Sequence, residues 1–137
     1  MRRCGAALVC LAAATCLAAD PSREVLQLFT EMAASLSAGN AREFLAAFDP
    51  AMPGYGKLRQ NVTALVAQGD IESSVEIAAD EGDAQKRELE VDWRMRVKRE
   101  QAATAGIPRQ QRLKVRVEKR GKKWKVTWLE PLEFFAP

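Results

Sequence analysis

The stretch FDPAMPGYG, residues 48–56, holds the side chains best suited to chemistry. Tyr55 is the only tyrosine of the chain, and Asp49 precedes it in the same stretch. A phenol that donates a hydrogen bond and a carboxylate that removes a proton can stabilise an enolate when both face an apolar pocket. Tyr55 and Asp49 are therefore the candidate catalytic residues. The alternative is a corner, because Pro and Gly set turn geometry, with the Tyr55 ring packed on the core.

Several common kinds of site lack the residues that they need. The chain has no histidine, and its three cysteines, Cys4, Cys10 and Cys16, all lie near its start. Histidine-based acid–base catalysis and the Ser-His-Asp arrangement are excluded, and residues 20–137 offer no ligands for the usual zinc sites. The acidic stretch at 80–83 lacks the alternating ligand spacing of a calcium loop and indicates a hairpin tip. We expect no metal and no cofactor.

Residues 1–19 have the pattern of a secretory signal peptide. Two arginines precede an apolar run over 6–19, which is too short to cross a hydrocarbon core of about 30 Å. The pattern predicts cleavage after Ala19, with Ala18 as the alternative position. It therefore predicts an exported protein, periplasmic or extracellular, with no membrane span after cleavage. A lipidated Cys16 is the alternative, although the Ala-Ala-Thr before it makes a poor lipoprotein motif.

Residues 20–137 have the length of one domain, and three segments in their first half have helical periodicity. The first begins at an Asp20 cap and ends at Gly39. The second begins at an Asn40 cap with Glu43 as its capping-box partner, and the third covers 57–68. Their apolar faces are Val25, Leu28, Phe29, Met32 and Leu36, then Phe44, Leu45 and Phe48, and then Leu58, Val62, Leu65 and Val66.

After Gly69 the apolar residues alternate with polar ones, which indicates strands. The four alternating segments are 71–79, 87–98, 112–119 and 123–128. The residues predicted to face inward are Ile71, Val75, Ile77, Leu89, Val91, Trp93, Met95, Val97, Leu113, Val115, Val117, Trp124, Val126 and Trp128. An antiparallel sheet with one apolar face needs cover on that face only, and the three helices supply it. These patterns predict an α+β domain.

This order of elements resembles the nuclear transport factor 2-like superfamily, which includes SnoaL-like and ketosteroid-isomerase-like proteins. The resemblance lies in EVLQLFTEMAASLSAGNAREFLAAFDP (24–50), ELEVDWRMRV (88–97) and KWKVTWLEPLEFF (123–135). It covers nearly all of 20–137. It implies a cone-like fold, in which three N-terminal helices pack on the concave apolar face of a curved four-stranded antiparallel sheet. It also implies an apolar cavity between helices and sheet, but many members have no known activity, so the fold sets no reaction.

In such a fold, residues 48–56 would lie near the open mouth of the cone. We predict that the cavity is lined by Phe29, Phe44, Phe48, Tyr55, Trp93, Met95, Trp124 and Trp128. Asp92 has inward-pointing neighbours on both sides, so it points outward and cannot supply the second acid that ketosteroid-isomerase-like enzymes place on a strand. We therefore expect a binding or interaction domain for a small apolar ligand. The alternative is a SnoaL-like isomerase or hydrolase that uses Tyr55 and Asp49.

Charge is unevenly distributed along the chain. Residues 20–92 carry 6 basic and 14 acidic side chains, whereas residues 93–137 carry 13 and 4. The basic residues of the strands would also suit a third function, that of a surface module that binds anions. The strand tryptophans, however, are predicted to face inward, and nucleic-acid binders need exposed aromatics for stacking. We expect acidic and basic residues to pair across strands. We expect no nucleic-acid partner. The oligomeric state is not predicted, and a homodimer is one alternative.

Overall fold

The computed structural model describes residues 20–99 and 106–137. Three helices come first, namely α1 (Pro21–Ser37), α2 (Ala41–Leu45) and α3 (Tyr55–Val66). The strands β1 (Asp70–Gly82), β2 (Lys86–Lys98), β3 (Arg109–Arg120) and β4 (Lys123–Glu130) follow, and the 3-10 helix η1 (Leu132–Phe135) ends the chain. The α+β order is confirmed. The expected signal peptide and Cys16 lie outside the described residues, within which no helix is long and apolar enough to cross a membrane.

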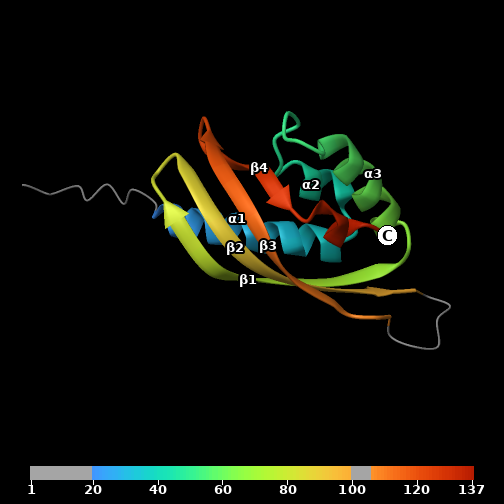
Figure 1. Ribbon diagram of the computed structural model, residues 1–137. Helices are drawn as coiled ribbons and strands as arrows, with labels where there is room; N and C mark the ends of the chain where they lie inside the picture. Colours follow the sequence, from blue (N-terminus) through green and yellow to red (C-terminus); the bar gives the residue numbers. More distant parts are fainter. Residues whose placement is uncertain (1–19, 100–105) are drawn as a thin grey trace, which may run out of the picture.

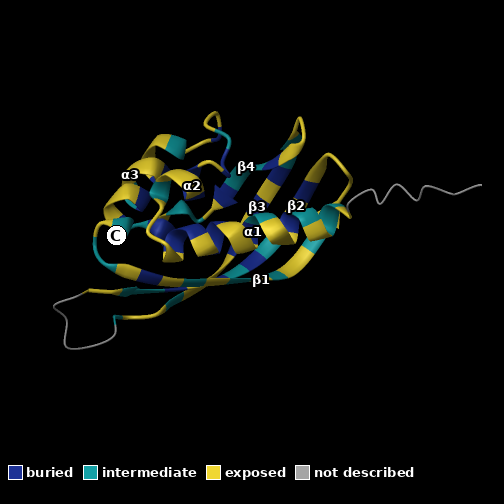
Figure 2. Ribbon diagram, turned by 180° about the vertical axis from the view of Figure 1, so that it is seen from behind, coloured by how far each residue is buried: buried dark blue, intermediate teal, exposed yellow. Residues whose placement is uncertain are grey.

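The four strands form one antiparallel sheet in the order β1-β2-β3-β4. Figure 1 shows the sheet curving around α1, with α2 and α3 lying beside β4 and the C-terminal turn. Figure 2 shows that the exposed residues of α1 face away from the sheet. Three helices therefore cover the concave face of a curved sheet, as predicted.

The helix starts depend on local capping. Asp20 accepts a hydrogen bond from the Ser22 N–H at 3.1 Å, and Asn40 accepts one from the Glu43 N–H at 3.0 Å. Both predicted caps are thereby confirmed, since each satisfies a backbone donor that a helix start leaves unpaired. The start of α3 differs from the prediction by two residues. Gly54, at φ +79°, turns the chain directly into the helix, so Tyr55 is its first residue and not part of the loop.

An aromatic cluster fills the space between the helices and the sheet. The ring of Trp93 lies 5.1 Å from that of Phe135 and 6.1 Å from that of Phe44, and Phe29 packs against its edge. Phe135 belongs to η1, to which the sequence analysis assigned no role. Phe29, Phe44, Trp93 and Met95 are each at most 2% exposed. These predicted cavity residues therefore form a packed core.

The prediction that Trp128 faces inward is wrong. Val126 and Trp128 pair with consecutive residues of β3, so Thr127 is an extra residue between them. Such a β-bulge reverses the alternation of the strand. Leu129, 4% exposed, takes the inward position instead. Trp128 is half-buried on the outer face, where the guanidinium of Arg116 lies 5.6 Å from the centre of its ring.

The outer face of the sheet is charged and largely paired. Asp92 points outward as predicted and accepts two hydrogen bonds from Arg112, at 2.8 and 3.0 Å. The Arg112 guanidinium holds the pKa of Asp92 below its ordinary value. Arg116 forms a cross-strand ion pair with Glu88 at 3.3 Å. Cross-strand pairing of the outer charges is therefore confirmed at these positions.

Candidate functional site

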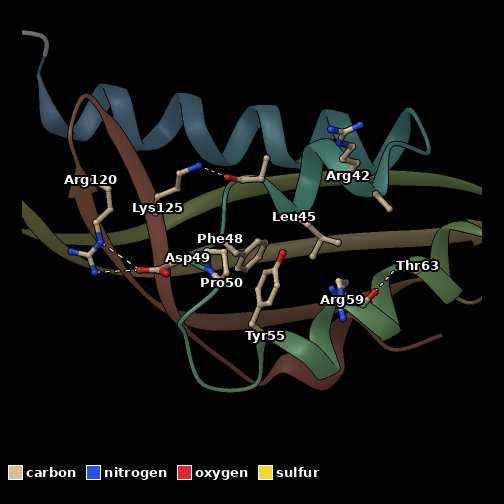
Figure 3. A pocket seen from close by; sticks show the side chains of 12 residues that line it. Arg42, Leu45, Phe48, Asp49, Pro50, Tyr55, Arg59, Thr63, Arg120 and Lys125 are labelled. Carbon is tan, nitrogen blue, oxygen red and sulfur yellow. Dashed lines mark hydrogen bonds and ion pairs between the residues drawn. The ribbon is translucent and has the colours of Figure 1, made fainter.

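An open groove of about 890 Å³ runs between α2, α3 and the β3–β4 hairpin (Figure 3). We call it the α2–α3 groove. It is lined by Ala41, Arg42, Leu45, Ala46, Phe48, Asp49, Pro50, Tyr55, Arg59, Thr63, Arg120 and Lys125. The structure thus brings both candidate catalytic residues, Asp49 and Tyr55, to one groove. Of the other predicted lining residues, it places only Phe48 there.

The chain after α2 is held against the free edge of β4. Phe48 forms a parallel bridge with Val126, whose N–H donates to the Ala47 carbonyl at 2.8 Å. The N–H of Asp49 in turn donates to the carbonyl of Val126, also at 2.8 Å. These bonds hold the Phe48 ring in the floor of the groove and place the Asp49 carboxylate at its side.

The α3 side of the groove follows from helical spacing. Tyr55, Arg59 and Thr63 lie four positions apart, which puts them on one face of a helix. Leu58 and Val62 point to the core instead and are fully buried. This spacing is visible in the sequence, and it could have located Arg59 and Thr63 once Tyr55 was placed on the helix.

The Asp49 carboxylate is fully engaged within the protein. One oxygen accepts a hydrogen bond from the Ala51 N–H at 2.9 Å, and the other faces the Arg120 guanidinium at 3.3 Å. The Ala51 N–H is the largest cause of the lowered pKa of Asp49; burial opposes it, and Arg120 and Lys125 reinforce it. A general base works best with a pKa near the working pH, so this lowering makes Asp49 a weak base.

The basic residues of the groove divide into two groups. Arg120 pairs with Asp49, and the Lys125 ammonium donates to the Ala46 carbonyl. Arg42 and Arg59 have no ion pair or side-chain hydrogen bond among the residues that the structure describes. Figure 3 shows both at the end of the groove away from the Asp49–Arg120 pair. Sequence patterns did not point to Arg42, Arg59 or Arg120, and they placed Lys125 only among the basic residues of the strands.

Comparison with known proteins supports the fold. No known family matches the chain by sequence, and no curated protein does. Solved structures do match. A protein of unknown function with a cystatin-like fold from Nostoc punctiforme is 18% identical over 79% of this chain and 86% of its own, with a TM-score of 0.63. A nuclear transport factor 2-like protein of unknown function from Shewanella oneidensis is 12% identical over 80% and 97%, with a TM-score of 0.61.

This chain has the nuclear transport factor 2-like fold. A candidate scytalone dehydratase from Novosphingobium aromaticivorans shares it, at 11% identity over 79% of this chain and 80% of its own, with a TM-score of 0.61. At such low sequence identities, the likeness to these structures shows a shared fold and gives no information on activity.

Phe48 belongs both to the packed interior of this nuclear transport factor 2-like domain and to the lining of the groove. Phe48 packs on Phe44 of the buried cluster with ring centres 5.2 Å apart, and it also lines the groove. The predicted lining residue Trp124 lies elsewhere, in a second groove between α1 and the β3–β4 hairpin. Trp128 lines a hollow on the outer face. The candidate site is therefore the α2–α3 groove.

Proposed function

We propose that this protein is a non-enzymatic binding domain that takes a small molecule with an apolar body in the α2–α3 groove. The observation that carries the proposal is the groove itself, with Leu45, Phe48 and Pro50 among its lining. Its volume of about 890 Å³ suits a small molecule, since ligand sites commonly measure about 300–1,000 Å³.

Catalysis by Asp49 and Tyr55 has less support. Asp49 is the only carboxylate among the lining residues, and its pKa is lowered, the wrong direction for a general base at neutral pH. Asp92 lies on the outer face in a pair with Arg112. An isomerase or hydrolase at this groove would therefore depend on a weak base.

An anion-binding function of the outer strand face also has less support. Arg112 is engaged by Asp92 and Glu90, and Arg116 by Glu88. A ligand anion would have to displace these partners. The groove needs no such exchange, because Arg42 and Arg59 have no partner among the described residues.

Fluorescence titration with N-phenyl-1-naphthylamine, a neutral apolar probe, tests the proposal. Thr63 is exposed and lines the groove, so Thr63→Trp should block it and weaken probe binding. Ala64→Trp is the matched control, because Ala64 is exposed on the same helix but does not line the groove. Absence of probe binding, or equal binding by the two variants, would overturn the proposal.

We also propose that the domain is exported after loss of residues 1–19. The α1 cap is Asp20, so cleavage after Ala19 would leave the first helix and its cap whole. Mass spectrometry of the protein produced with its native start in a bacterial host should find Asp20 at the N-terminus. An intact Met1 on the exported protein would contradict export by cleavage, and a lipid on Cys16 would favour the lipoprotein alternative.

A further inference from the structure

We infer that the ligand of the α2–α3 groove is an amphipathic organic anion, whose charged group is held at the end formed by Arg42 and Arg59. The inference rests on the proposed function and names the ligand class of the same groove. That class is a molecule with an aromatic or aliphatic body and one carboxylate, sulfonate or phosphate group.

The side chains that line the groove carry an excess of positive charge. Its lining contains four basic side chains and one carboxylate. Asp49 neutralises Arg120, which leaves Arg42, Arg59 and Lys125 without an acidic partner among the described residues. An apolar cation would meet repulsion here, whereas an anion would be attracted.

Some hydrogen-bonding groups of the groove are already used within the protein, and others are not. Both oxygens of Asp49 are engaged, the Thr63 hydroxyl donates to the Arg59 carbonyl at 2.8 Å, and Lys125 donates to a backbone carbonyl. The guanidinium groups of Arg42 and Arg59 and the hydroxyl of Tyr55 have no partner within the part of the chain that the structure describes. A guanidinium is only a donor, so the complementary ligand group is an acceptor.

The two arginines and the apolar side chains occupy different parts of the groove. Arg42 comes from α2 and Arg59 from α3, and Figure 3 shows Leu45, Tyr55 and Phe48 between them and the Asp49–Arg120 pair. The apolar body of a ligand would thus lie on these side chains with its anionic group at the arginine end. A guanidinium suits this role because its planar array of donors matches carboxylate and phosphate oxygens.

Two probes with the same aromatic body test the inference. The compound 8-anilinonaphthalene-1-sulfonate is anionic, and N-phenyl-1-naphthylamine is its counterpart without the sulfonate. We expect the wild-type protein to bind the anion more tightly. The double variant Arg42→Gln/Arg59→Gln should weaken anion binding by about tenfold, equivalent to about 1.4 kcal/mol, and change binding of the neutral probe by less than about twofold.

The control is the double variant Arg94→Gln/Lys114→Gln, which removes the same charge from exposed positions on the sheet. It should leave the affinity for both probes unchanged, and circular dichroism should show that all variants fold.

The outcomes separate the inference from the proposed function. If the neutral probe binds in the groove but the arginine variant loses no anion affinity, or loses no more than the control, the inference is overturned and the proposed function stands. If neither probe binds, or if Thr63→Trp blocks neither, the proposed function fails and the inference falls with it. Loss of anion affinity confined to the arginine variant, while the neutral probe still binds in the groove, supports both.

Discussion

At the scale of single residues, Trp93 carries a polar atom into an otherwise apolar interior. Its indole N–H donates to the Ser73 hydroxyl of the neighbouring strand at 2.8 Å, while its ring is fully buried. A buried N–H without a partner costs stability. Ser73 is therefore the residue that allows the largest fully buried side chain of the core to lie there. By contrast, the indole N–H of Trp124 is buried without a partner among the described residues.

We predict that Ser73→Ala destabilises the fold by about 1–3 kcal/mol, because it leaves the Trp93 N–H unsatisfied. Ser74→Ala is the matched control, since Ser74 is exposed at the next position, and it should stay within about 0.5 kcal/mol of wild type. Urea denaturation measures both. Equal effects of the two substitutions would show that the bond contributes nothing.

Asp49 gives a prediction for the pH dependence of stability. Its pKa in the folded protein lies below the ordinary 3.8, so folding favours the ionised carboxylate. That contribution is present above the ordinary pKa and is lost as the pH falls through the folded-state pKa. Asp49→Asn removes it. The difference in unfolding free energy between wild type and Asp49→Asn should therefore shrink as the pH falls from about 5 to about 2.

Denaturation at a series of pH values measures this difference. Arg120→Gln should make the change with pH smaller, because Arg120 contributes to the lowered pKa, but the Ala51 N–H should preserve part of it. A difference that does not change with pH would contradict the assignment of Asp49 as an engaged carboxylate.

At the scale of elements, the bulge in β4 determines which aromatic and aliphatic residues the strand buries. Trp124 and Val126 face the core before the bulge, and Leu129 faces it afterwards. The extra residue Thr127 turns Trp128 to the outer face, where it packs beneath Arg116. The residue that β4 buries in the core after the bulge is therefore aliphatic Leu129 and not Trp128.

The bulge predicts unequal losses of stability for substitutions at two neighbouring residues. Leu129→Ala should destabilise the protein by about 2–5 kcal/mol, as expected when a buried leucine leaves a cavity. Trp128→Ala should cost less, because half-buried Trp128 leaves no enclosed cavity, and its contact with Arg116 is worth about 0.5–1 kcal/mol at an exposed site. Guanidinium denaturation of both variants measures the two costs. A larger loss for Trp128→Ala would place the bulge elsewhere in the strand.

At the scale of the whole molecule, the C-terminal turn closes the interior of the cone. Phe134 and Phe135 of η1 are buried, and the Phe135 ring lies 5.3 Å from Phe44 and 5.1 Å from Trp93. Arg109 holds the turn in place by donating to the Phe134 carbonyl at 3.1 Å. The segment after the sheet thus supplies part of the core that the helices and strands leave unfilled.

We predict that Phe135→Ala destabilises the protein by about 3–5 kcal/mol, because it leaves a cavity at the centre of the aromatic cluster. Glu133→Ala in the same turn is the control. Glu133 is exposed, so this change should remain within about 0.5 kcal/mol of wild type. Thermal and chemical denaturation measure both variants. A neutral Phe135→Ala would mean that the turn adds no packing to the core.

Local physics explains what the sequence by itself determined. Asp20 and Asn40 cap helices through bonds to residues two or three positions away, so their roles can be read from adjacent letters. The alternation of 87–98 likewise predicted the buried side of β2 and the outward direction of Asp92. The fold class followed, because helices and strands with one apolar face each have few ways to bury it.

Only the tertiary structure decided the features that depend on distant contacts. The bulge at Thr127 is a mismatch between two paired strands, and no pattern within β4 alone marks it. Phe135 enters the core because the chain turns back after the sheet. The groove combines Arg42 and Arg59 from two helices with Asp49 and Arg120, which are 71 positions apart in the sequence. Residues so separated meet only when the helices have packed on the sheet, so their arrangement depends on the whole fold.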